Sequence, residues 1–177
     1  AQYKAVDGAP TDWHLIHYGE RAKGGAGLVY TEMTCVSPEG RITPGCPGLY
    51  TDEQATAWAR LNAFIHAETK AKTCCQIGHA GRKGSTQVGW EDMDAPLATG
   101  NWPLLSASAI PWSEANAVPK AMDRADMDMV RYEMMVEDCA ADTRVYLQDC
   151  VLDVRTGERA PHDPGNGNLG CMSVVYG

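Results

Sequence analysis

The stretch that most constrains the fold of this chain is residues 72–84, which read KTCCQIGHAGRKG. A short apolar run ends there on a polar amide and passes into a glycine-punctuated loop with a His, an Arg and a Lys. A buried parallel strand followed by a loop that carries function has this pattern. Gln76 falls at the carboxyl end of that strand, where its amide offers a donor and an acceptor to a bound heterocycle. We therefore expect the rest of the chain to support this position.

Helices and strands alternate along most of the chain, and this order is typical of a parallel α/β sheet. The predicted elements are a helix over 11–23, a strand within 26–36, a helix from Thr51 with Gln54 in its capping box, a strand over 72–77, a long loop over 78–122 and a helix over 123–143. A loop of this length in a compact domain is usually functional. We expect the two strands to pair in parallel.

The apolar runs predict which side chains form the core. Strands that are covered on both faces have continuous apolar runs, and here the expected buried residues are Leu28, Val29, Tyr30, Cys74 and Cys75. Helical spacing predicts a second buried stripe of Ala57, Trp58, Leu61, Phe64 and Ile65. A third stripe, on the last helix, comprises Met129, Tyr132, Val136, Cys139 and Ala140.

The pattern changes after Arg144, so we divide the chain into residues 1–143 and a divergent tail, 144–177. The tail predicts one strand over 145–154, a turn over 155–158 and a Pro/Gly/Asn loop over 160–170. Residues 165–170 match the sequence motif G-x-G-x-x-G, but a dinucleotide site also needs a strand before that motif and a helix after it. We interpret these glycines as a turn, and we do not expect the tail to add a parallel strand to the sheet.

Composition excludes several classes of function. At 177 residues, with 44% hydrophobic and 21% charged residues, the chain resembles an ordinary soluble globular domain. Its formal net charge of −8 argues against a nucleic-acid partner, because proteins that bind phosphate backbones are basic. The sequence contains no run of about 20 apolar residues, the length that is needed to span a bilayer. The N-terminus has no signal-peptide pattern. We expect a cytoplasmic protein that does not bind membranes.

The cysteines and histidines do not indicate a metal site. The seven cysteines form no C-x-x-C pair, and two of them fall within the strand at 72–77, where a thiol behaves as a small hydrophobic group. His14 and His17 lie three residues apart on the first helix without a third ligand nearby. We predict buried thiols, histidines that are packed or lie at the surface, and no metal.

Several separated motifs resemble a known family. Residues 40–43 (GRIT), the HAGRK run at 79–83 after Gln76, and residues 107–111 (ASAIP) are similar to the Old Yellow Enzyme family. Within that family, the segments at 12–14, 31–34 and 100–103 most resemble the flavin-reductase part of salicylyl-CoA hydroxylase fusion proteins. The resemblance covers roughly residues 1–140 and implies a (β/α)8 barrel with parallel strands and outer helices.

The resemblance also implies a function. Members of this family bind FMN, take hydride from NAD(P)H and reduce a small molecule with an activated alkene, such as an enoyl thioester. Carried over to this chain, Gln76 would hydrogen-bond the pyrimidine edge of the flavin, and the Met33 backbone would lie against its ring. Ala1 would contact the flavin, and Tyr3 would be the catalytic residue that contacts the substrate.

The same resemblance implies an incomplete barrel. A complete (β/α)8 barrel needs about 250 residues. The first strand and the later units, including the substrate-binding His pair and the loops that hold the flavin phosphate, have no counterpart in residues 1–177. We therefore expect an incomplete fragment that is inactive in isolation. The alternative is a non-catalytic α/β scaffold or binding module that pairs with a second copy or a complementing chain, because exposed sheet edges attract partners.

Overall fold

The computed structural model describes residues 1–134, 144–147, 150–153 and 159–161. Its first part contains α1 (Asp12–Lys23), β1 (Leu28–Cys35), α2 (Asp52–Glu68) and β2 (Lys72–Gly78). The short helix η1 (Gly81–Lys83), strands β3 (Leu105–Ser106) and β4 (Lys120–Ala121) and helix α3 (Arg124–Glu133) follow. The last described elements are β5 (Arg144–Leu147), β6 (Cys150–Asp153) and β7 (Arg159–Pro161).

Both long helices begin where the sequence predicts. The Thr11 N–H donates to Nδ1 of His14 at 3.0 Å, and this contact closes a capping box at the start of α1. The Gln54 N–H donates to Oγ1 of Thr51 at 3.3 Å and caps α2. The glycine pair that begins at Gly24 ends α1.

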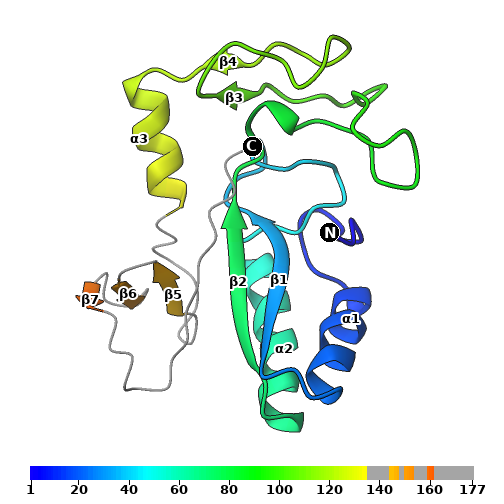
Figure 1. The fold of residues 1–177 in the computed structure, drawn as a ribbon, viewed down its shortest axis with the longest axis vertical. Coiled ribbons are helices and arrows are strands. Elements are labelled where there is room, and N and C mark those ends of the chain that lie inside the picture. The colour runs from blue at the N-terminus through cyan, green and yellow to red at the C-terminus, as the bar shows by residue number, and fades with distance from the viewer. Residues whose placement is uncertain (135–143, 148–149, 154–158, 162–177) are drawn as a thin grey trace.

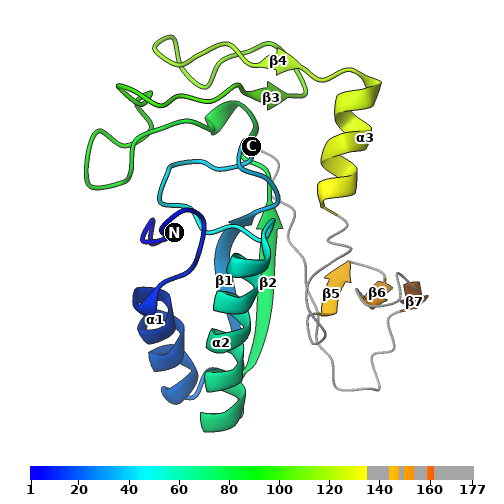
Figure 2. The same ribbon diagram turned by 180° about the vertical axis from the view of Figure 1, so that it is seen from behind.

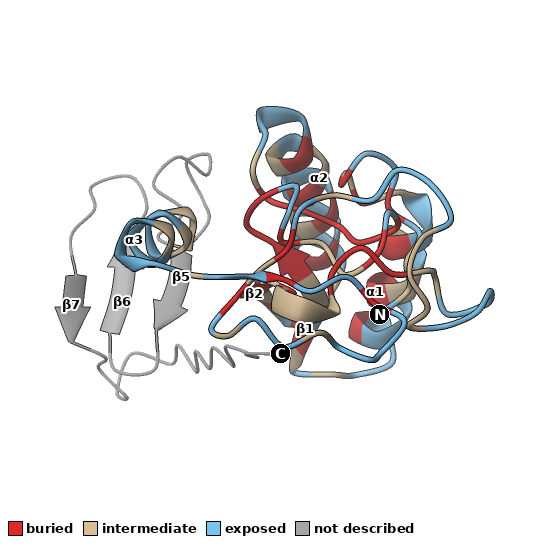
Figure 3. Cartoon of the chain, turned by 90° about the horizontal axis from the view of Figure 1, so that it is seen from above, coloured by how far each residue is buried: buried red, intermediate tan, exposed pale blue. Residues whose placement is uncertain are grey.

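Strands β1 and β2 form the predicted parallel pair, and α1 and α2 cover one face of it (Figures 1 and 2). The core lies between these helices and strands, where Figure 3 shows most of the buried positions. Trp58, Leu61 and Ile65 of α2 contribute to it, as predicted, together with Val29 and Ile77 from the strands. Burial of one such side chain contributes about 1.5–3 kcal/mol.

Some predicted core positions are wrong. Val29 and Cys74 are buried, but Leu28 and Cys75 are only half-buried and Tyr30 is 41% exposed. Leu28 and Tyr30 flank the core residue Val29 in β1, so they lie on the face that α1 and α2 do not cover and keep solvent contact. Cys75 packs against the core but is only partly covered.

The helical stripes are also only partly confirmed. On α2, Ala57 is half-buried and Phe64 is 38% exposed. Phe64 packs over Gly19 of α1, where an added Cβ would lie 3.0 Å from its ring, and its outer edge stays in solvent. Met129 and Tyr132 on α3 are exposed, at 45% and 61%, because α3 stands away from the core (Figure 3). Val136, Cys139 and Ala140 lie outside the described residues.

The predicted long loop is confirmed, since only η1 and the two-residue strands β3 and β4 interrupt residues 79–122. The tail differs from the prediction. In place of one strand over 145–154, β5 and β6 pair antiparallel, and β7 extends their sheet to Pro161. The described tail strands pair with one another and not with β2, as expected. The motif at 165–170 lies outside the described residues.

No helix in the described part of the chain is both long and apolar enough to cross a membrane.

Candidate functional site

The carboxyl ends of β1 and β2 bring Met33 and Gln76 together. The two residues are direct partners in the parallel register, and both are half-buried. In barrels built from parallel strands, sites form at this end of the sheet. Two of the predicted cofactor-binding residues, 43 positions apart in sequence, therefore lie side by side where such a site is expected.

A bulge in β1 sets this pairing. Between Tyr30 and Met33 the strand advances one residue more than β2 does between Cys74 and Gln76. The Oγ1 of Thr31, a buried residue, accepts the Gln76 backbone N–H at 2.9 Å and so replaces a bond of the ladder. The backbone of Gln76 is therefore fixed, while its side-chain amide has no hydrogen-bond partner among the described residues and is available to a ligand.

Glu32, which is not among the predicted site residues, anchors the start of the chain to β1. One of its carboxylate oxygens, Oε2, accepts the backbone N–H of Gln2 at 2.7 Å and that of Tyr3 at 3.4 Å. Residues 1–5, here called the N-terminal strap, are also held by the Ala5 N–H, which donates to the Gly45 carbonyl at 3.1 Å. Gly45 must be glycine for this approach, since a Cβ there would overlap the Tyr3 carbonyl group.

The other oxygen of Glu32 faces helix α1. Its Oε1 accepts the Tyr18 hydroxyl at 3.2 Å and lies 3.2 Å from Nε2 of the fully buried His14. Because Nδ1 of His14 accepts the Thr11 N–H, a neutral His14 carries its proton on Nε2, toward the carboxylate. Burial opposes ionisation, but the contacts with His14 and the Gln2 N–H hold the pKa of Glu32 below its ordinary value. Glu32 is therefore an ionised carboxylate in a mostly polar, enclosed setting.

The signal for Glu32 was present in the sequence. A carboxylate at the end of an apolar strand is costly unless it is paired, so its position within 26–36 indicates partners. What the sequence could not supply is the identity of those partners, because they come from α1 and from the N-terminal strap.

Tyr3 has an unusual backbone, with φ of 51°, in the left-handed region that few non-glycine residues adopt. Burial raises the pKa of its phenol, and the nearby Cys46, Asp94 and Glu32 raise it further. Tyr3 therefore keeps its proton at neutral pH and is able to donate a hydrogen bond to a ligand.

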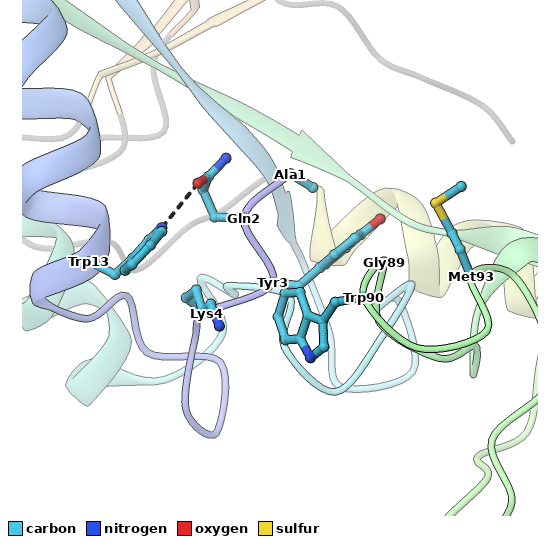
Figure 4. A pocket seen from close by; sticks show the side chains of 8 residues that line it. All are labelled: Ala1, Gln2, Tyr3, Lys4, Trp13, Gly89, Trp90 and Met93. Carbon is cyan, nitrogen blue, oxygen red and sulfur yellow. Dashed lines mark hydrogen bonds between the residues drawn. The ribbon is translucent and has the colours of Figure 1, made fainter.

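A cavity of about 520 Å³ opens beside the N-terminal strap (Figure 4). Its lining residues are Ala1, Gln2, Tyr3, Lys4, Trp13, Gly89, Trp90 and Met93. The Lys4 ammonium lies 3.9 Å from the centroid of the Trp90 ring, and Trp13 Nε1 donates to the Gln2 side chain at 3.0 Å. The structure thus places Ala1 and Tyr3 in one cavity and pairs Met33 with Gln76 at the strand ends, and Glu32 joins the two groups.

The loop after β2 uses its charged groups within the chain. Nδ1 of His79 accepts the Gly81 N–H at 3.1 Å, and burial lowers its pKa. Lys83 pairs with Asp94 at 3.1 Å. Arg41, from the GRIT motif, stacks 4.8 Å from the centroid of Trp102. These contacts hold the long loop near the strand ends. Within the described ranges, no three His, Cys, Asp or Glu side chains are grouped as metal ligands.

Comparison with known proteins gives three consistent findings. Residues 2–141 match the family model of the NADH:flavin oxidoreductase / NADH oxidase family. A curated NADH:flavin oxidoreductase from Gibberella zeae is 38% identical over 139 residues, which are 76% of this chain and 33% of the relative. The chain thus spans about a third of that relative's length.

Two solved structures match the fold. They are morphinone reductase in complex with tetrahydroNAD and a second structure of morphinone reductase, each with a TM-score of 0.61 and 22% identity. The matches cover 76% of this chain and 38% and 37% of the two solved chains. They confirm the predicted fold, a part of an α/β barrel with parallel strands and outer helices.

Proposed function

This chain belongs to the NADH:flavin oxidoreductase / NADH oxidase family, and from that membership we propose that it is part of an FMN-dependent NAD(P)H oxidoreductase of the ene-reductase type. When bound, FMN supplies the hydride-transfer chemistry between NAD(P)H and an alkene made electron-poor by a carbonyl or thioester group. The chain itself supplies placement and hydrogen bonds.

The pairing of Met33 with Gln76 at the carboxyl ends of β1 and β2 carries this proposal. The Gln76 amide, which has no partner among the described residues, would donate to and accept from the pyrimidine edge of the ring. The Met33 backbone would lie against the ring, and Ala1 would contact it from the N-terminal strap. A polar edge and an apolar face of this kind fit a flat heterocycle.

Tyr3 is the residue proposed to meet the substrate. Its phenol remains protonated at neutral pH and lines the cavity beside the N-terminal strap. It donates a hydrogen bond to the carbonyl oxygen of the substrate, which polarises the alkene, an electrostatic role. Glu32 positions Tyr3 through the backbone and does not touch the substrate.

A flavin titration of the full 177-residue chain tests the proposal. We expect Gln76→Ala to weaken flavin binding by about 1–2 kcal/mol, a rise in Kd of about 5- to 30-fold, because one or two neutral hydrogen bonds are lost. Quenching of flavin fluorescence measures the Kd. The matched control is Lys72→Ala, at the exposed amino end of the same strand, which leaves the Kd unchanged. Equal Kd values for Gln76→Ala and the unaltered chain would contradict the assignment of Gln76.

A second candidate is the non-catalytic module that pairs with another chain. Exposed apolar side chains favour it, namely Tyr30 on β1 and Met127, Met129 and Tyr132 on α3. Size-exclusion chromatography with light scattering separates the two functions. A stable dimer or complex that does not bind flavin supports the module, and flavin binding that depends on Gln76 supports the oxidoreductase.

A further inference from the structure

The cavity beside the N-terminal strap gathers exposed apolar side chains around one cation. Trp13, Trp90 and Met93 are 53%, 57% and 62% exposed, and all three line the cavity (Figure 4). Large apolar side chains that gather on a surface mark a binding site, whereas scattered ones do not. Of the described residues that line the cavity, only Lys4 has a charged side chain. The volume of about 520 Å³ is in the range of small-molecule sites.

Lys4 is held in position but keeps hydrogen-bond donors for a ligand. Its backbone carbonyl accepts the Thr11 hydroxyl at 3.1 Å, which fixes the main chain. Its ammonium lies 3.9 Å from the centroid of the Trp90 ring and 5.5 Å from that of Trp13. No acidic side chain in the described part of the chain forms an ion pair with it. An ammonium has three N–H donors, so contact with a ring face leaves donors for an anion.

The carboxylates near the cavity are engaged elsewhere. Asp94 pairs with Nζ of Lys83 at 3.1 Å, and Glu32 accepts backbone N–H groups of the N-terminal strap. Glu91 and Asp92, which follow Trp90 in the sequence, are exposed and do not line the cavity. An anion at Lys4 therefore meets no carboxylate in the cavity lining.

A glycine leaves room for a ring beside Tyr3. A Cβ added at Gly89 would lie 3.7 Å from Cε2 of Tyr3 and 3.9 Å from Sδ of Met93, at ordinary contact distances. Because Gly89 has no side chain, the Tyr3 ring and the Met93 sulfur are open to a ligand, and aromatic rings pack well against both groups. Burial raises the pKa of Tyr3, so its phenol stays neutral and does not repel an anion.

We propose that this cavity binds an aromatic carboxylate, whose ring packs against Tyr3 and Trp90 and whose carboxylate accepts hydrogen bonds from the Lys4 ammonium. The substrate of the proposed reaction is then an electron-poor alkene that carries an aryl group and a carboxylate. Only this naming of the ligand as the substrate rests on the proposed function. Binding itself requires neither flavin nor NAD(P)H.

Calorimetric titration of the full 177-residue chain without flavin tests the charge. The probes are 3-phenylpropanoate and its neutral counterpart, 3-phenylpropanamide, and we expect the carboxylate to bind more tightly. Lys4→Met keeps an apolar stem against Trp90 but removes the charge. It should raise the Kd of the carboxylate about 3- to 10-fold and leave the Kd of the amide unchanged. Lys4→Arg should restore binding of the carboxylate. Lys23→Met, at the exposed end of α1, is the matched control without effect.

A second variant tests the place of the ring. Gly89 lies outside the left-handed backbone region, so Gly89→Leu is tolerated, and its side chain fills the space beside Tyr3. We expect it to weaken binding of both probes, whereas Gly27→Leu, at an exposed position in open space, should not.

The outcomes separate this inference from the proposed function. Equal Kd values for the two probes, no measurable binding of 3-phenylpropanoate, or unchanged binding in Gly89→Leu would overturn the inference and leave the flavin assignment of Gln76 standing. Carboxylate binding that depends on Lys4 and Gly89 supports it, even where the flavin titration of Gln76→Ala contradicts the oxidoreductase.

Discussion

Glu32 shows how one residue connects distant parts of the chain. Its carboxylate meets the Gln2 and Tyr3 backbone on one side and His14 and Tyr18 on the other. Three segments, the N-terminal strap, α1 and β1, therefore share one buried charge. Removing one member of such a group leaves the others unsatisfied, which costs more than the lost bond alone.

We predict that Glu32→Gln lowers the free energy of unfolding at neutral pH by about 1–3 kcal/mol, since the amide keeps the shape but loses the charge. Urea denaturation measures the change. Glu20→Gln, on the exposed face of α1, is the control and should change stability little.

The same variant gives a pH dependence with a defined sign. Because the pKa of Glu32 is lower in the folded chain, its contribution is complete above the unfolded value of about 4.3 and is lost as pH falls through the folded value. The difference in stability between the unaltered chain and Glu32→Gln should therefore shrink below about pH 4. A difference that stays constant from neutral pH to pH 3 would show that the charge contributes nothing.

For single residues, the sequence predicted the place of a residue within a strand better than the burial of its side chain. Gln76 and Met33 were placed at strand ends from the apolar pattern, and the register confirms that they are neighbours. Tyr30 was predicted to be buried and is exposed, because periodicity shows that a run is apolar but not which face a helix will cover. The hydrogen bond from the Cys35 N–H to the Pro47 carbonyl depends on how a turn-rich loop returns to β1, which no local pattern encodes.

Among the elements, β1 is distinguished by the bulge that sets its register with β2. The bulge between Tyr30 and Met33 interrupts the ladder, and the Thr31 hydroxyl takes the Gln76 N–H that the ladder would otherwise bind. A side chain thus restores a backbone hydrogen bond at the position where the candidate site begins.

We predict that Thr31→Val destabilises the chain by about 1–3 kcal/mol, because the nearly isosteric valine leaves the Gln76 N–H without an acceptor. Amide hydrogen exchange at Gln76 should become faster than at Ile77, its neighbour in β2. Thr56→Val, at an exposed position of α2, controls for the substitution itself. Unchanged exchange at Gln76 in Thr31→Val would mean that the hydroxyl is not the acceptor in solution.

The elements with caps and long apolar runs could be predicted from sequence, and the tail could not. Thr11 and Thr51 mark helix starts through local hydrogen bonds, so a few residues suffice to locate α1 and α2. Residues 145–154 form an apolar run that a polar pair, Gln148 and Asp149, interrupts. The antiparallel strands β5 and β6 lie on either side of these two polar residues. Whether such a run forms one strand or two is decided by hydrogen bonding between strands and not by residue propensity.

For the molecule as a whole, the central fact is that the chain spans 33% of the curated relative. The residues proposed here would contact the flavin ring. The family resemblance assigns the groups that bind the flavin phosphate to later strands of the barrel. A charge-assisted hydrogen bond contributes about 1.5–3 kcal/mol, so the loss of two or three amounts to about 3–9 kcal/mol. That is most of the roughly −8 kcal/mol of a micromolar ligand.

We therefore predict that the isolated 177-residue chain purifies colourless, with a Kd for FMN above about 10 μM and no NAD(P)H oxidation when FMN is added. Riboflavin, which lacks the phosphate, is the matched ligand and should bind about as well as FMN. Fluorescence quenching measures both. A yellow protein, or FMN binding far tighter than riboflavin binding, would show that this chain or a second copy provides the phosphate site.

The extra residue in β1 has a consequence at the level of the gene. Loss of one codon, for Thr31 or for Glu32, would leave Met33 opposite Gln76 and would make the ladder more regular. It would also remove either the hydroxyl that holds Gln76 or the carboxylate that holds the N-terminal strap. Such a deletion would separate folding from function: circular dichroism would report a retained helix–strand fold, while the flavin titration would report the loss of the site.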